Sequence, residues 1–222
     1  MVCLLHLLPD SPSQSARVPQ ADPRLSLIHI SNGEDNQDGS DLNYSWNCGV
    51  EGKTRRKKIL SLRKQQIKNA LSFVLLAPGT PLIYSGDEFG NSQDGNNNAY
   101  CQDNEISWLN WNLLKTNRDI FEYTKALIQL RKDNPIFGWG KPYRMMDYLA
   151  CGYPDVSVHG TKPWYPSYTR ESRTFGIMYC GRYDPGERGE EFLYIAFNMY
   201  WEPEEFSLPA LPSGYVLSLR HI

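Results

Sequence analysis

Two adjacent carboxylates, Asp87 and Glu88, directly follow a short apolar run and are the first candidates for acid and base chemistry. A paired acid and base must reach the same bond. Adjacent residues at the end of a strand point to opposite faces of the sheet, so these two carboxylates cannot converge. We therefore expect Asp87 and Glu88 to serve packing or a hydrogen bond on the substrate side.

A cluster of short hydrogen-bonding side chains beside an aromatic ring follows in the same loop. Amides and carboxylates can form paired hydrogen bonds with sugar hydroxyls, and an aromatic ring can lie beneath the sugar ring. We predict that these side chains form one wall of a sugar-binding site, with the substrate-binding residues Asn97, Asn98, Tyr100, Gln102 and Asp103. The alternative is that these side chains bond to the backbone of their own loop, as Asn and Asp commonly do.

The same loop partly matches a calcium-binding pattern. Asp94, Asn96, Asn98 and Glu105 fall at positions one, three, five and twelve, but Ala99 replaces the glycine needed at position six. The helices that flank such a loop are also absent from the pattern. We expect neither a metal site nor a cofactor.

Downstream, one histidine and several aromatic residues are further candidates. His159 has no second metal ligand nearby, which indicates a structural role. Trp164, Tyr165 and Tyr168 suit either stacking on sugar rings or filling a crevice between domains, and crevice filling is the commoner use of such rings.

Composition excludes several classes of function. The 222 residues carry 23 Lys and Arg against 25 Asp and Glu, a net charge of −2 that favours neither nucleic acid nor anionic lipid. No window reaches the roughly 18 apolar residues of a membrane span. The five cysteines are scattered and lack zinc-site spacing, so we expect no zinc and a reducing, cytoplasmic location.

Hydrophobic periodicity predicts two helices around a buried strand and a long loop. The first helix covers residues 56–76, with Leu60, Ile67, Leu71 and Val74 on one face, and ends before Pro78-Gly79. A strand at 80–86 and an aperiodic loop at 87–111 follow. The second helix begins at a Thr116 cap with Asp119 as its capping-box partner. Its buried face comprises Ile120, Tyr123, Leu127 and Leu130, and it ends at Asn134-Pro135.

The remainder of the chain changes to a β pattern. Alternating and continuous apolar runs predict strands within residues 172–183, 190–201, 204–209 and 214–222.

Three segments resemble one enzyme family. Residues 79–111 (GTPLIYSGDEFGNSQDGNNNAYCQDNEISWLNW) closely resemble the last barrel strand and following loop of the isoamylase-type, glycogen-debranching branch of the α-amylase superfamily, glycoside hydrolase family thirteen. Residues 32–52 are similar to the loop after the seventh barrel strand of these enzymes. Residues 146–166 and the strands after them are similar to the start of their C-terminal β domain.

This resemblance implies a fold of α/β plus all-β class, the C-terminal part of a (β/α)8 TIM barrel followed by an antiparallel β-sandwich. Residues 31–140 would form the end of the barrel, and residues 141–222 an incomplete β domain. Residues 1–30 match nothing in the family, and we expect them to be non-native or disordered.

The resemblance also implies hydrolysis of α-1,6 branch linkages in glycogen or starch, with a branched α-glucan as partner. Family members use two carboxyl groups, assisted by a third, on strands that precede residue 32. One of these follows a His, and no His-Asp pair occurs in the chain. We therefore assign no catalytic residue and expect the chain alone to be inactive. The alternative is a non-catalytic α-glucan-binding module that uses the aromatic and Asn-rich loops.

Overall fold

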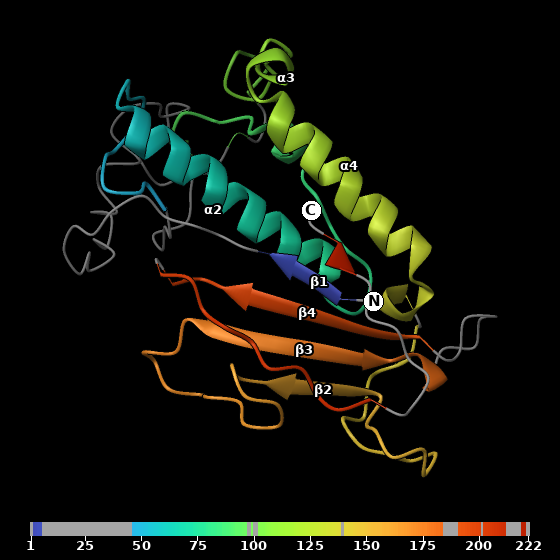
Figure 1. Cartoon of the computed structure of the whole chain (residues 1–222). Coiled ribbons are helices and arrows are strands. Elements are labelled where there is room, and N and C mark those ends of the chain that lie inside the picture. Colours follow the sequence, from blue (N-terminus) through green and yellow to red (C-terminus); the bar gives the residue numbers. More distant parts are fainter. Residues whose placement is uncertain are drawn as a thin grey trace. The chain divides into compact units, whose positions relative to one another are not determined.

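The computed structural model of the protein describes residues 2–5, 46–96, 99, 102–138, 140–183, 191–200, 202–211 and 219–220 (Figure 1). The chain divides into two compact units. The sheet unit comprises Met1–Pro12, Leu75–Pro81 and Ala126–Ile222, and the helical unit comprises Ser13–Val74 and Leu82–Lys125. No helix in the described part of the chain is long and apolar enough to cross a membrane.

The first predicted helix is confirmed as α2, Lys57–Leu76, but its buried face is rotated from the expected one. Leu71 is buried as predicted, whereas Leu60 and Val74 are exposed. The buried stripe instead includes Ser72, whose hydroxyl lies 2.8 Å from the Lys68 carbonyl oxygen and 2.6 Å from the Tyr123 hydroxyl. A polar residue whose hydrogen bonds are satisfied can occupy a buried helix position that an apolar pattern does not reveal.

The second predicted helix is α4, Arg118–Asp133, and it follows a single turn, α3, Leu113–Thr116. The predicted capping box at its start is wrong. Thr116 is the last residue of α3, where its hydroxyl donates to the Leu113 carbonyl oxygen at 3.3 Å. The Asp119 carboxylate instead pairs with Lys64 at 2.8 Å and Lys68 at 3.2 Å, and these bonds join the start of α4 to the middle of α2.

The buried face and the end of α4 agree with the prediction. Ile120, Leu127 and Leu130 are buried, and Tyr123 is half-buried. Asn134 ends the helix and donates from its side-chain amide to the Leu130 carbonyl oxygen at 2.7 Å. The 3-10 helix η2, Pro135–Gly138, follows.

The strand predicted at residues 80–86 is not formed. Residues 80–84 have no regular secondary structure, and Leu82 is 89% exposed. An isolated strand cannot satisfy its backbone groups, and no described strand pairs with this segment. An apolar run in the sequence does not by itself provide a neighbouring strand.

The sheet unit contains one sheet with strand order β2-β3-β4-β1-β5 (Figure 1). Its antiparallel part consists of β2, Val156–His159, β3, Thr174–Cys180, and β4, Phe192–Asn198. Strand β1, Val2–Leu5, pairs parallel with β4 and with β5, Leu219–Arg220.

The predicted strands β3 and β4 are confirmed, whereas the predicted sandwich is not. The described strands form a single sheet, and described residues 204–209 have no strand. Of the last predicted strand, at 214–222, only β5 lies within the described residues. Strand β2 was not predicted, because its four residues lie in a segment dominated by aromatic residues and prolines.

Seven consecutive residues of β4 are buried, so both faces of this strand are covered. One face contributes Phe192, Tyr194 and Ala196 to a core that also includes Met178 and Cys180 of β3. Segments 148–153 and 206–211 contribute side chains that pack against this core: Tyr148, Cys151, Tyr153, Phe206, Leu208 and Leu211.

The guanidinium of Arg131 holds together the backbone of the sheet unit near residues 75–79. It donates to the carbonyl oxygens of Leu75 and Phe137 at 2.7 and 2.8 Å, to that of Ala77 at 2.8 Å, and also to that of Gly79. Burial lowers the pKa of Arg131, while the nearby Tyr179 and Tyr143 act in the opposite direction. The cation therefore satisfies carbonyl groups that the end of α2 leaves unpaired.

Replacement of Arg131 with Met should lower the free energy of unfolding by about 2 kcal/mol, because several carbonyl oxygens lose their donor. Urea unfolding followed by circular dichroism measures this loss. Arg118→Met is the matched control, since Arg118 lies on the same helix and pairs only at the surface with Glu122. Equal unfolding midpoints for the two variants would contradict the role given to Arg131.

His159 of β2 is fully buried and uses both ring nitrogens. Its Nδ1 accepts a hydrogen bond from the Trp164 backbone N–H at 2.9 Å, and its Nε2 lies 2.8 Å from the Ser157 hydroxyl. Accepting at Nδ1 requires a neutral ring with its proton on Nε2. These contacts agree with the structural role predicted for His159.

Burial lowers the pKa of His159 from its ordinary value of 6.5. The unfolded chain then binds the proton more readily than the folded one, so this contribution to stability is complete above about pH 6.5 and falls as the pH drops below it. We expect the urea midpoint to decrease from pH 7.5 to 5.5, and to decrease less in His159→Gln. An equal decrease in both proteins would show that His159 is not the titrating group.

Candidate functional site

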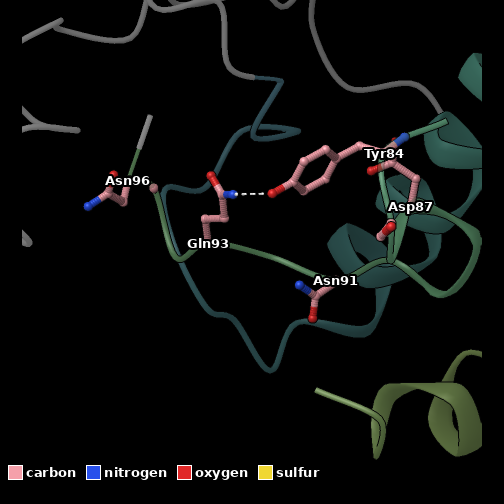
Figure 2. Close-up of a pocket in the computed structure, with 7 residues that line it drawn as sticks. Tyr84, Asp87, Asn91, Gln93 and Asn96 are labelled. Atoms are coloured by element: carbon pink, nitrogen blue, oxygen red, sulfur yellow. Dashed lines mark hydrogen bonds between the residues drawn. The ribbon is translucent and has the colours of Figure 1, made fainter. Parts of the chain in front are cut away.

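The candidate site is a pocket of about 430 Å³ in the helical unit, on the loop that follows residue 83 (Figure 2). Its lining is polar and mostly uncharged. The residues that line it are Tyr84, Ser85, Asp87, Asn91, Gln93, Gly95 and Asn96.

Two glycines turn the chain sharply on either side of the 3-10 helix η1, Asp87–Phe89. Gly86 has φ 101°, and a Cβ atom there would lie 2.6 Å from the Asn91 Cβ. Gly90 has φ 69°, in the same left-handed region. Larger residues are strained at such angles, and Gly86 also has no space for one.

The turn is closed by hydrogen bonds, two of which involve the pocket residue Asn91. The Asn91 N–H donates to the Gly86 carbonyl oxygen at 2.9 Å, and the Asn91 side-chain oxygen accepts from the Asn110 N–H at 3.0 Å. Asn117, at the start of α4, donates from its side chain to the Phe89 carbonyl oxygen at 3.0 Å. The pocket wall is therefore fixed at both ends of the turn.

Asp87 and Glu88 both bond to the backbone just before them. The Asp87 carboxylate accepts from the Tyr84 N–H at 3.1 Å, and the Glu88 carboxylate accepts from the Gly86 N–H at 2.8 Å. Burial raises the pKa of Asp87, the Tyr84 N–H acts in the opposite direction, and the Glu88 charge adds to the increase. Of the two, only Asp87 is among the residues that line the pocket, and both lie in η1 rather than at the end of the predicted strand.

The ring of Tyr84 and the amide of Gln93 face each other across part of the pocket (Figure 2). The Gln93 side chain donates to the Tyr84 hydroxyl at 3.4 Å, and the tyrosine is 63% exposed. This arrangement offers an accessible aromatic face beside amide donors and acceptors. Such a surface can bind a neutral ligand rich in hydroxyl groups.

The arginine Arg63 of α2 positions a second loop in the same unit. It donates to the Asn47 carbonyl oxygen at 3.0 Å, to that of Gly52 at 2.8 Å, and also to that of Val50. Lys53, which follows Gly52 in this loop, forms an ion pair with Asp94 at 2.9 Å. Asp94 directly precedes two pocket residues, so this exposed ion pair connects the loop at 47–53 to the pocket wall.

The predicted substrate-binding residues are only partly described. Asn97, Asn98 and Tyr100 lie outside the described residues. Gln102 and Asp103 are described but are not among the residues found to line the pocket. The Asp103 carboxylate accepts from the Trp108 ring N–H at 2.8 Å, a contact within its own loop.

The described residues contain no group of three or more His, Cys, Asp or Glu side chains that could hold a metal ion. Of the calcium-like pattern, Asp94 pairs with Lys53, and Asn98 lies outside the described residues.

Sequence reasoning missed most of the pocket. Tyr84, Ser85, Asn91, Gln93 and Gly95 were not predicted as site residues, and Asn96 was noted but not selected. The available signal was local, because Gly86, Gly90 and Gly95 mark a chain that turns repeatedly within ten residues.

Comparison with curated proteins shows extended sequence similarity, although no family model matches the chain. The chain is 47% identical over 106 residues to a glycogen operon protein GlgX homolog of Mycobacterium tuberculosis, and 50% identical over 104 residues to a glycogen debranching enzyme of Erwinia tasmaniensis. These matches cover 48% and 47% of the chain. Isoamylase 1 of Arabidopsis thaliana is 32% identical over 188 residues, or 84% of the chain. The chain spans 15%, 16% and 22% of the length of these three relatives.

Solved structures show a corresponding likeness in fold. A mutant of pullulanase from Paenibacillus barengoltzii, complexed with maltotetraose, superimposes with a TM-score of 0.51 at 21% identity. The match covers 71% of this chain and 21% of the pullulanase chain. The sequence matches identify the chain as similar to part of the isoamylase-type, glycogen-debranching enzymes of glycoside hydrolase family thirteen, and the structural likeness adds agreement of fold alone.

Proposed function

We propose that this chain is part of a hydrolase of α-1,6 branch linkages in glycogen-type or starch-type glucans, and that its pocket binds the glucan. The relatives are named as glycogen debranching enzymes and isoamylases, and a structural neighbour was solved with maltotetraose. Residues 31–140 would belong to the end of a (β/α)8 barrel and residues 141–222 to a C-terminal β domain. Cys48, Cys151 and Cys180 are free thiols, which supports a cytoplasmic location.

The observation that carries the proposal is the chemistry of the pocket lining. Tyr84 presents an exposed ring, the Gln93 amide faces it, and Asn91 and Asn96 are further lining residues (Figure 2). Glucans carry hydroxyl groups around apolar ring faces and have no charge. An aromatic face surrounded by amides is complementary to both features.

The same pocket supports binding without hydrolysis by these 222 residues alone. A retaining glycosidase needs two carboxyl groups about 5 Å apart, and an inverting enzyme needs two at a larger separation. Among the described residues, Asp87 is the one carboxylate in the pocket lining, and it bonds to its own turn. Glucan binding without catalysis is therefore the second candidate function for the isolated chain.

Native electrophoresis of the full chain through gels containing glycogen tests the proposal. We expect retardation, and we expect Tyr84→Ala to weaken the apparent affinity by about tenfold, or about 1.4 kcal/mol, because it removes an exposed ring. Leu82→Ala is the control, since Leu82 is exposed in the same unit but does not line the pocket.

A reducing-end assay on the same samples should show no release of sugar from glycogen. Unretarded migration of the wild-type chain would contradict glucan binding. Release of reducing ends by the pure chain would contradict the assignment of binding without catalysis.

A further inference from the structure

A loop of the sheet unit presents aromatic rings that the pocket does not use. In residues 160–168, Trp164 is 45% exposed, Tyr165 76% and Tyr168 81%. Pro163 and Pro166 flank the first two rings and restrict the backbone between them. Large rings exposed together on a short segment are typical of a surface that binds something.

The backbone of this loop is held in one conformation by buried groups. Trp164 adopts φ 67°, an uncommon value for a residue of its size, and its N–H donates to Nδ1 of buried His159 at 2.9 Å. The Trp164 and His159 rings pack edge to face, with centroids 4.7 Å apart. The exposed Trp164 ring is thus held in place by the fully buried His159 side chain.

Two further contacts fix the two sides of the loop. Gly160 has no space for a side chain, because a Cβ atom there would lie 2.4 Å from the Tyr165 carbonyl oxygen. The Ser207 N–H donates to the Thr161 carbonyl oxygen at 2.9 Å and joins the loop to the segment that covers the sheet. A surface that is already ordered loses little conformational freedom when a ligand binds.

We propose that this loop, through Trp164 and Tyr165, is a second contact site for an α-glucan chain, separate from the pocket. The class of ligand rests on the proposed function, whereas the site rests on the geometry of the loop. Trp and Tyr rings offer flat apolar area at little entropic cost, which suits the apolar face of a glucose ring.

The charge of the loop agrees with an uncharged ligand. Lys162 is the one charged residue in 160–168, and the other polar side chains are hydroxyl groups: Thr161, Ser167 and the two tyrosines. A surface for a charged partner would need more charge.

The test compares single variants of the full chain by electrophoresis in glycogen gels. We expect Tyr165→Ala to weaken the apparent affinity by about fivefold and Tyr165→Phe to retain it, because the ring rather than the hydroxyl makes the contact. Met146→Ala is the control, since Met146 is exposed in the same unit outside the loop. Trp164→Phe provides a second variant that preserves an aromatic side chain above His159, and we expect a smaller loss. Unfolding midpoints equal to that of the wild type show that each variant is folded.

The outcomes separate this inference from the proposed function. Weaker retardation in Tyr165→Ala supports the loop site, whatever the result for Tyr84→Ala. Retardation that depends on Tyr84 but is unchanged by both Tyr165→Ala and Trp164→Phe overturns the loop site and leaves the pocket. A wild-type chain that is not retarded overturns both. A change in the oligomeric state of Tyr165→Ala, measured by sedimentation, with unchanged glucan affinity would identify a protein interface instead and overturn the inference.

Discussion

The contact between the Arg131 guanidinium and four backbone carbonyl groups is the constraint on which the sheet unit depends. It joins the end of α2, the turn at Ala77 and Gly79, and the η2 residue Phe137. No acidic side chain pairs with Arg131 among the described ion pairs, so carbonyl dipoles surround the cation. Arg63 makes the same kind of contact with backbone carbonyl groups in the helical unit. In both cases one planar cation donates to several backbone carbonyl groups of a turn and so fixes its conformation.

The two candidate binding surfaces are built by similar means. At the pocket, Gly86 allows a turn that the Asn91 N–H closes, and Tyr84 then stands exposed beside amide groups. At the aromatic loop, His159 fixes Trp164 in a left-handed conformation and leaves its ring accessible. In each place an unusual backbone angle, supported by hydrogen bonds, presents a ring to solvent. Rigid presentation of rings suits a ligand as uniform and uncharged as a glucan.

The sequence predicted those elements whose signal is local. Helical periodicity located α2 and α4, and apolar runs located β3 and β4. Residues 80–84 did not form the predicted strand, because a strand requires a neighbour that an apolar run cannot specify. The buried face of α2 was misplaced because Ser72 is buried through a hydrogen bond to Tyr123. The pocket was largely missed for a related reason, since Tyr84 and Gln93 become neighbours only when glycine turns bring them together.

The most direct test of the central claim, that this chain binds α-glucan through the pocket and the aromatic loop, is hydrogen exchange of the full chain with and without maltohexaose. Mass spectrometry of peptides then locates the amides that exchange more slowly in the presence of the sugar. We predict slower exchange in peptides that cover residues 84–96 and 160–168, and little change in the rest of the described chain. Unchanged exchange in both segments at saturating maltohexaose, or slower exchange confined to other segments, would contradict it.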